Sequence, residues 1–180
     1  SSNVGYKQNW YAENATAPST APVATGVGSI ALGDSPEALA DNMFVFGNSA
    51  GLSATNANDS NFIGQFTGYQ ATNSNSSNFF GSNAGGSATN ANDSNFIGTY
   101  AGLFATNAND SNFFGSNAGF SAASANNSAF IGSNSGYGAQ YANNSAFIGS
   151  NAGYQAENAS YCNLFGTNVG KSFTGNNIGS

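Results

Sequence analysis

Two columns of glycine recur along this chain with an unbroken 17-residue period. The first column holds Gly47, Gly64, Gly81, Gly98, Gly115, Gly132, Gly149 and Gly166. The second follows four positions later in each repeat and holds Gly51, Gly68, Gly85, Gly102, Gly119, Gly136, Gly153 and Gly170. A fixed period of this length is the signature of a stacked repeat, in which each unit buries its apolar side against its neighbours. The period constrains the fold more than any other feature.

The residues between the glycines favour strands and tight bends. A pair of large apolar residues, such as Phe96 and Ile97, precedes each glycine of the first column, and such residues favour strands. The run from Asn90 to Asn95 consists of turn-forming residues. Glycine pairs in every repeat exclude long helices. We therefore expect an all-β fold, a parallel β-solenoid in which each 17-residue wrap (a rung) stacks on the next at roughly 4.8 Å.

The composition is biased towards neutral polar residues. Only 6% of the residues are charged, against roughly 25% in an ordinary domain. Bias of this kind alone is typical of disorder, but 39% of the residues are apolar and they recur at fixed columns. Stacked rungs place Asn over Asn and Phe over Phe, which forms amide ladders and ring stacks. Like charges stacked in this way would repel, so the fold itself explains their scarcity.

The charge pattern also bears on partners. The net charge is −6, and Lys7 and Lys171 are the only basic residues. Nucleic-acid binding requires clustered Lys and Arg, so we expect none. No apolar run approaches the ~20 residues that span a bilayer, and we expect no membrane insertion.

Residues 1–28 lie outside the 17-residue pattern and contain Pro18 and Pro22, so they are predicted to be an extended N-terminal arm or linker. The arm carries three aromatic residues: Tyr6, Trp10 and Tyr11. These residues either dock the arm to a partner or pack on the first rung, and the sequence leaves both possibilities open.

Residues 29–180 are predicted to be the β-solenoid domain. Its first rung is shorter, because Gly33 precedes Gly47 by a 14-residue step in place of the 17-residue one. The chain ends with a partial rung, so we expect that the protein continues or that another domain or subunit covers that end.

The paired apolar residues predict association between copies. Neighbouring strand residues point to opposite faces, so if Ile97 fills the interior of the coil, Phe96 points outwards. The predicted oligomer seam is then a column of six phenylalanines: Phe62, Phe79, Phe96, Phe113, Phe130 and Phe147. An exposed stripe of this size exceeds what monomers ordinarily tolerate. The alternative is a bulge that lets both residues of each pair point inwards.

Groups suited to catalysis are scarce. The chain has no histidine and a single cysteine, Cys162, in a column otherwise filled by serine. Asp93 and Asp110 stand one rung apart and are the nearest approach to a glycosidase pair or a calcium site, but Asn fills the same column in later rungs and favours a turn role. A four-rung threonine column from Thr55 to Thr106 is too short for an ice-binding face. We expect no enzyme activity, metal or cofactor.

Two segments resemble known fibrous proteins. Residues 28–34 (Gly-Ser-Ile-Ala-Leu-Gly-Asp), followed one short step later by Phe-Val-Phe-Gly at residues 44–47, resemble the head repeats of YadA-like trimeric autotransporter adhesins. Residues 144–154 and the leader at residues 11–22 are similar to phage tail fibre proteins. The resemblance implies a parallel, left-handed β-roll assembled as a homotrimer. In that family one apolar residue of the motif fills each coil and the other meets the neighbouring chains.

The resemblance also implies a function. We expect a structural fibre protein of a phage virion, a stiff trimeric shaft or spacer in a host-attachment appendage, with residues 1–28 docked to other virion proteins. A host surface glycan or protein is a possible partner. The alternative is the head of a trimeric adhesin on a bacterial cell surface.

Overall fold

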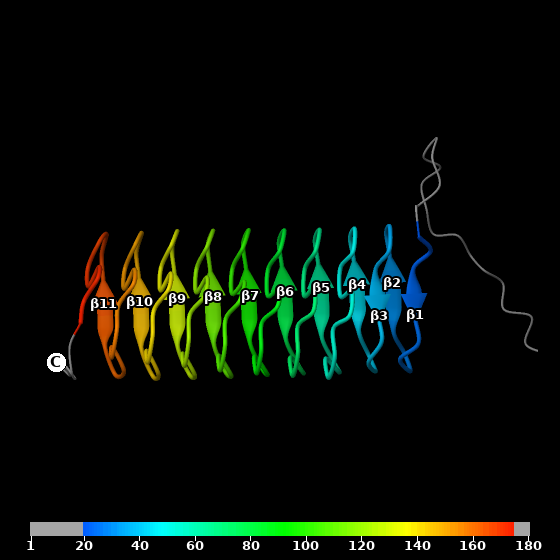
Figure 1. The fold of residues 1–180 in the computed structure, drawn as a ribbon, viewed down its shortest axis with the longest axis horizontal. Helices are drawn as coiled ribbons and strands as arrows, with labels where there is room; N and C mark the ends of the chain where they lie inside the picture. The colour runs from blue at the N-terminus through cyan, green and yellow to red at the C-terminus, as the bar shows by residue number, and fades with distance from the viewer. Residues whose placement is uncertain (1–19, 175–180) are drawn as a thin grey trace, which may run out of the picture.

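The computed structural model describes residues 20–174 and shows a parallel β-solenoid (Figure 1). The strands are short, of two or three residues: β1 (Val23–Ala24), β2 (Ile30–Leu32), β3 (Glu37–Ala38), β4 (Phe44–Phe46), β5 (Asn61–Ile63), β6 (Asn78–Phe80), β7 (Asn95–Ile97), β8 (Asn112–Phe114), β9 (Ala129–Ile131), β10 (Ala146–Ile148) and β11 (Asn163–Phe165). They stack along the long axis of the molecule, and the described residues contain no helix. The all-β solenoid prediction is confirmed.

Register follows the sequence period. One nine-stranded parallel sheet runs in the order β11-β10-β9-β8-β7-β6-β5-β4-β2, and β1 pairs with β3. Ile30 pairs with Phe44, which confirms the 14-residue first step, and Phe44 then pairs with Asn61 at the 17-residue step. A second line of parallel bridges runs from Thr55 to Thr174 through the same column of each rung. Each rung is therefore bonded to the next on two sides.

The coil begins before the predicted boundary at residue 29. Strand β1, which lies in the predicted arm, pairs with β3 of the solenoid, and the Val23 N–H donates to the Pro36 carbonyl at 3.0 Å. The Asp41 carboxylate also accepts from the Val27 N–H at 2.7 Å. The described part of the arm, residues 20–28, thus belongs to the solenoid. No glycine of the 17-residue pattern marks this segment, so the period did not reveal it.

One large side chain fills each rung. In the rung of residues 95–111, Phe96 is fully buried, and the other interior positions are held by small residues, among them Ala101, Ala105, Ala108 and Ser111. The phenylalanine rings of successive rungs stack at centroid distances of 4.7–4.9 Å, with interplanar angles of 3–7°. The core is therefore a single continuous ring stack surrounded by small side chains.

The predicted outward orientation of the phenylalanines is wrong. All six residues of the predicted seam are 0% exposed inside the coil: Phe62, Phe79, Phe96, Phe113, Phe130 and Phe147. Their neighbours point outwards instead, as Ile97, 40% exposed, shows. The bulge alternative is wrong too, because the two residues of each pair lie on opposite faces. The second glycine column explains why the phenylalanines point inwards.

Gly102 provides the space for the Phe96 ring. It has a φ of +62°, and a Cβ built there would lie 2.2 Å from the Phe96 Cδ2 atom. Gly98 serves the stacking of rungs, because its Cβ would lie 2.4 Å from the carbonyl oxygen of Gly115 in the next rung. The first glycine column thus allows close rung contact, and the second makes room for the rings.

Polar groups in the coil are bonded along the axis. The buried Ser94 hydroxyl donates to the Ala108 carbonyl at 2.6 Å and accepts from the Ser111 N–H at 3.0 Å, and the other serines of this column repeat the pattern. Outside, the Asn92 side chain donates to the Asn109 Oδ1 at 3.0 Å in a ladder that continues through several rungs. These ladders satisfy buried and half-buried polar atoms without any charge.

Ser74 is an exception and gives a stability prediction. Its side chain is fully buried, and its hydroxyl has no hydrogen-bond partner among the described residues. The same column holds buried alanines, Ala57 and Ala91, in the adjacent rungs. We expect Ser74→Ala to raise the free energy of unfolding by about 1–2 kcal/mol, because a buried polar group without a partner carries its desolvation cost uncompensated. Chemical denaturation measures the change, and an equal or lower stability would contradict this account.

Candidate functional site

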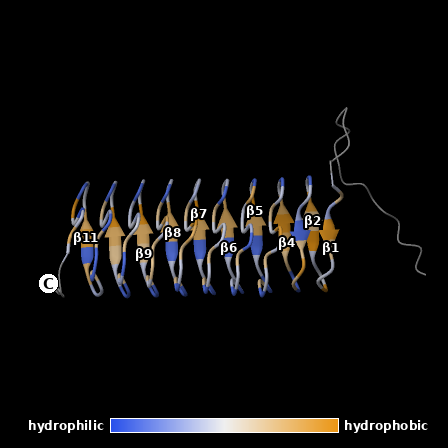
Figure 2. Cartoon of the chain, in the orientation of Figure 1, coloured by the Kyte–Doolittle hydropathy of each residue, from blue (hydrophilic) through white to orange (hydrophobic). Residues whose placement is uncertain are grey.

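The sheet presents an outer apolar column. It consists of one outward side chain per strand of the nine-stranded sheet: Leu32, Phe46, Ile63, Phe80, Ile97, Phe114, Ile131, Ile148 and Phe165. Their exposed fractions reach 50% at Phe46 and 64% at Phe165. In Figure 2 the hydrophobic part of most arrows of this sheet covers both the buried residue of each pair and its outward neighbour. No charged residue interrupts it, so it is a continuous apolar strip open to solvent.

A second row of rings lies elsewhere on the rung. Phe120, Tyr137 and Tyr154 stack at 4.8 and 5.0 Å with interplanar angles of 3° and 9°. The ammonium of Lys171 lies 5.4 Å from the Tyr154 ring centroid, which is a cation–π contact. Because the rings cover one another's faces, this row offers ring edges to solvent.

Several exposed aromatic residues have left-handed backbone conformations. Tyr100, Phe104, Tyr141 and Tyr161 have φ values between +51° and +62° and exposed fractions between 41% and 63%. Bulky residues rarely adopt this region, and such strain is concentrated at sites where another requirement offsets it. The same columns are left-handed in other rungs, where small or polar residues such as Asn83, Ser87 and Asn127 fill them, so the conformation belongs to the repeat and the aromatics are displayed on its turns.

The outer face also carries an amide ladder with a gap. Asn61, Asn78, Asn95 and Asn112 each lie at the start of a strand, and each of the first three donates its side-chain N–H to the next at 2.7–2.8 Å. Alanine replaces asparagine in β9 and β10, and Asn163 resumes the column in β11. Figure 2 shows the change, since the hydrophilic half of the arrows disappears at these two strands.

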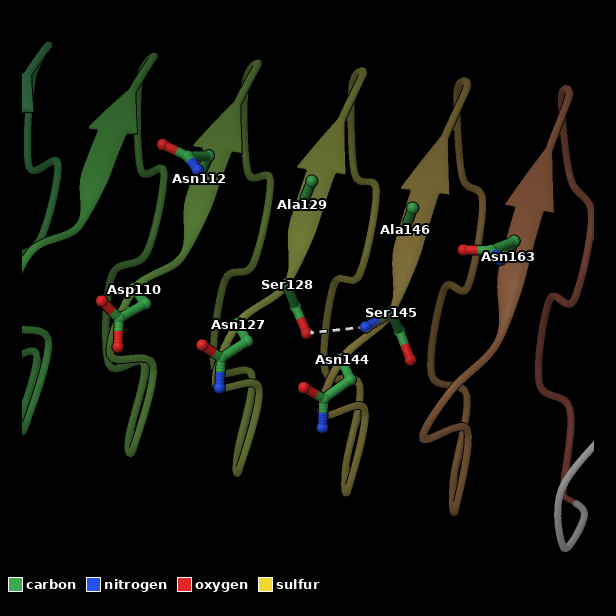
Figure 3. Close-up of a pocket in the computed structure, with 9 residues that line it drawn as sticks. All are labelled: Asp110, Asn112, Asn127, Ser128, Ala129, Asn144, Ser145, Ala146 and Asn163. Atoms are coloured by element: carbon green, nitrogen blue, oxygen red, sulfur yellow. Dashed lines mark hydrogen bonds between the residues drawn. The ribbon is translucent and has the colours of Figure 1, made fainter. Parts of the chain in front are cut away.

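A shallow depression lies at this gap (Figure 3). Its volume is about 320 Å³, and its lining comes from β8 to β11 and the turns before them: Asp110, Asn112, Asn127, Ser128, Ala129, Asn144, Ser145, Ala146 and Asn163. We call it the ladder gap. The sequence analysis missed it, although the replacement of Asn by Ala at residues 129 and 146 was the available signal.

Two acidic residues were weighed in the sequence analysis as a glycosidase pair or a calcium site. Asp93 and Asp110 lie at corresponding turn positions of adjacent rungs, both exposed and both with a φ of +55°, which is the turn role that the column of Asn and Asp predicted. Among residues 20–174, no cluster of three His, Cys, Asp or Glu side chains is placed to hold a metal ion. Cys162 is buried in the serine column, where its N–H donates to the Ser145 hydroxyl at 3.1 Å.

The remaining predicted site residues cannot be placed. Tyr6, Trp10 and Tyr11 lie outside the described residues, so their docking role stays a prediction. Within residues 20–174 there is no helix with the length and apolar character needed to cross a lipid bilayer.

The chain matches no protein-family model, and a comparison with curated proteins finds no match either. The functional argument therefore depends on the surfaces of the coil itself.

Proposed function

We propose that this chain is a structural fibre protein of a phage virion, a stiff homotrimeric shaft or spacer in a host-attachment appendage. The outer apolar column carries the proposal. A solenoid bonded between rungs on two sides is stiff along its axis, and an apolar strip that runs its full length is suited to lateral association with copies of itself. In this proposal the coil is left-handed, as in the adhesin-like repeats that the sequence resembles.

In this proposal the copies associate through the outer apolar column and not through the predicted phenylalanine seam. Four members of the outer apolar column are between 37% and 64% exposed: Phe46, Ile97, Ile131 and Phe165. Burying the remaining surface of each of these four side chains is worth about 1 kcal/mol, and the half-buried members of the column add to this gain against the entropic cost of association. All copies have the same rung spacing, so each rung of one copy lies beside the equivalent rung of its neighbour. The same contact then recurs at every rung, and cyclic symmetry repeats it between each pair of copies.

Residues on other faces support a role in attachment. The exposed aromatics Tyr100, Phe104, Tyr141 and Tyr161 lie outside the outer apolar column, so association through the column does not use them. In this proposal they contact a host surface, and the segment that precedes the coil docks the shaft to the particle through Tyr6, Trp10 and Tyr11.

The oligomer is tested by molecular mass in solution. Light scattering coupled to size exclusion is expected to give three times the chain mass of 18.1 kDa. Ile97→Asn, Phe114→Asn and Ile131→Asn together place an amide ladder on three adjacent rungs of the column, and we expect this variant to be monomeric with an unchanged circular dichroism spectrum. The control is Thr72→Asn, Thr89→Asn and Thr106→Asn in the bridge column, which should stay trimeric. A wild-type monomer at micromolar concentrations would refute the association.

The location is tested separately. Antibodies against the solenoid are expected to label a tail or capsid appendage of purified particles in electron micrographs. Labelling of the bacterial cell surface in the absence of particles would instead favour the adhesin head.

A further inference from the structure

The ladder gap has unmatched hydrogen-bonding groups at both ends. Each ladder asparagine donates its Nδ2 group to the Oδ1 atom of the next rung. Asn112 therefore keeps a donor that faces Ala129, and Asn163 keeps an acceptor that faces Ala146, because neither has a side-chain partner in the gap among the described residues. Figure 3 shows both side chains, one on each side of the two alanines.

The floor and rim of the gap differ in chemistry. Ser128 and Ser145 form part of the floor and are only 3% exposed, and the Ser145 N–H donates to the Ser128 hydroxyl at 3.1 Å, drawn as a dashed line in Figure 3. The floor is thus internally satisfied. The rim carries Asp110, Asn127 and Asn144, whose exposed side chains offer donors and acceptors to solvent.

The ligand that fits must replace two missing amide groups. A group in the gap has to accept a hydrogen bond on the Asn112 side and donate one on the Asn163 side. A secondary amide can take either vacant position, since its N–H and C=O point in opposite directions. A second polar group is needed at the other position, because amides in ladders repeat at roughly 4.8 Å. The methyl group of an acetamide would contact the Ala129 or Ala146 methyl, and a hydroxyl suits the carboxylate and amides of the rim.

We infer that the ladder gap binds a sugar that carries an N-acetamido group. The acetamide takes one vacant amide position, and neighbouring ring hydroxyls meet the other position and the rim. The volume of about 320 Å³ is at the lower end of the range for small-molecule sites and suits one or two sugar rings. No member of the outer apolar column lines the gap, although Ala129 lies on the same outer face of β9 as Ile131.

The test is a titration of the intact protein, labelled with ¹³C at the alanine methyl groups and followed by NMR. Two disaccharides are compared: diacetylchitobiose, which carries acetamido groups, and cellobiose, which carries hydroxyls in their place. We expect saturable shifts of the Ala129 and Ala146 methyl signals with diacetylchitobiose. Cellobiose should bind about tenfold more weakly, since the amide hydrogen bonds are lost.

Two variants provide the matched controls. Ala129→Asn with Ala146→Asn completes the ladder, and the fold should persist because the rungs on both sides already carry asparagine there. This variant lacks both reporter methyl groups, so it is compared with the wild type by calorimetric titration, and it should lose binding. Asn78→Ala with Asn95→Ala removes two ladder residues elsewhere and should leave the shifts at Ala129 and Ala146 unchanged. No saturable shift with diacetylchitobiose, an equal affinity for cellobiose, or binding retained by the completed ladder would each overturn the inference.

Discussion

Replacement of Phe96 by alanine is expected to lower the free energy of unfolding by about 3–5 kcal/mol, the range for a large aromatic side chain lost from a core. The ring is fully buried and stacks on Phe79 and Phe113 at 4.8 and 4.7 Å. The residues around it are alanine, glycine and serine, which have no side-chain length with which to fill the space. The cavity should therefore persist, and the cost should lie towards the upper end of that range.

The measurement is urea denaturation at one fixed protein concentration, because association would couple stability to concentration. Phe104→Ala is the matched control, since it removes the same side chain from the outside of the same rung. Phe104 is 51% exposed and has one edge contact with Phe120 at 5.9 Å, so we expect a loss of about 1 kcal/mol. Equal losses in the two variants would contradict the assignment of Phe96 to the core.

The architecture was predictable because the repeat determines strand register, turn positions and burial together. The 17-residue spacing of the glycines set which residues stack, and the structure pairs Phe62 with Phe79 and Asn61 with Asn78 at that spacing. The run of Asn and Asp residues predicted turns, and Asn90 and Asp93 indeed have left-handed conformations. Local propensity, spacing and burial agree, which is the condition under which a sequence specifies its fold.

The orientation of the paired apolar residues was not predictable from alternation. Alternation states only that Phe96 and Ile97 lie on opposite faces. The choice between them depends on volume: the interior is otherwise alanine, glycine and serine, so one ring per rung is needed to fill it. The signal in the sequence was the second glycine column, because Gly102 has no side chain where the Phe96 ring lies.

The candidate site was less accessible to sequence reasoning than the fold. The gap depends on the absence of two side chains at Ala129 and Ala146, and a substitution to alanine in a repeat ordinarily indicates only tolerance. It gains meaning from the direction of the ladder, which leaves a donor at Asn112 and an acceptor at Asn163. That direction is a property of side-chain geometry and cannot be inferred from residue identity.

Replacement of Gly102 by alanine is expected to cost roughly 3 kcal/mol in unfolding free energy, for two separate reasons. The new Cβ would lie 2.2 Å from the Phe96 ring, and overpacking of this kind typically costs about 1–3 kcal/mol. The left-handed φ of +62° adds about 1 kcal/mol, because alanine adopts it less readily than glycine. Gly138→Ala is the control, since it has a φ of +64° but its nearest atom is a flexible Gln155 carbon at 3.5 Å; it should show only the conformational cost.

A double-mutant cycle separates the steric cost from the conformational one. Near the start of the coil Val45 occupies the ring position opposite Gly51. A Cβ at Gly51 would lie 3.3 Å from the Val45 Cγ1 atom, although it would also lie 2.3 Å from the Glu37 carbonyl oxygen. Valine in place of Phe96 therefore removes the clash between the ring and a methyl group at residue 102. We expect Phe96→Val combined with Gly102→Ala to be about 1–2 kcal/mol more stable than the sum of the single effects predicts. Additive effects would mean that glycine is required here for its backbone conformation alone, and the ring stack would then not explain the second glycine column.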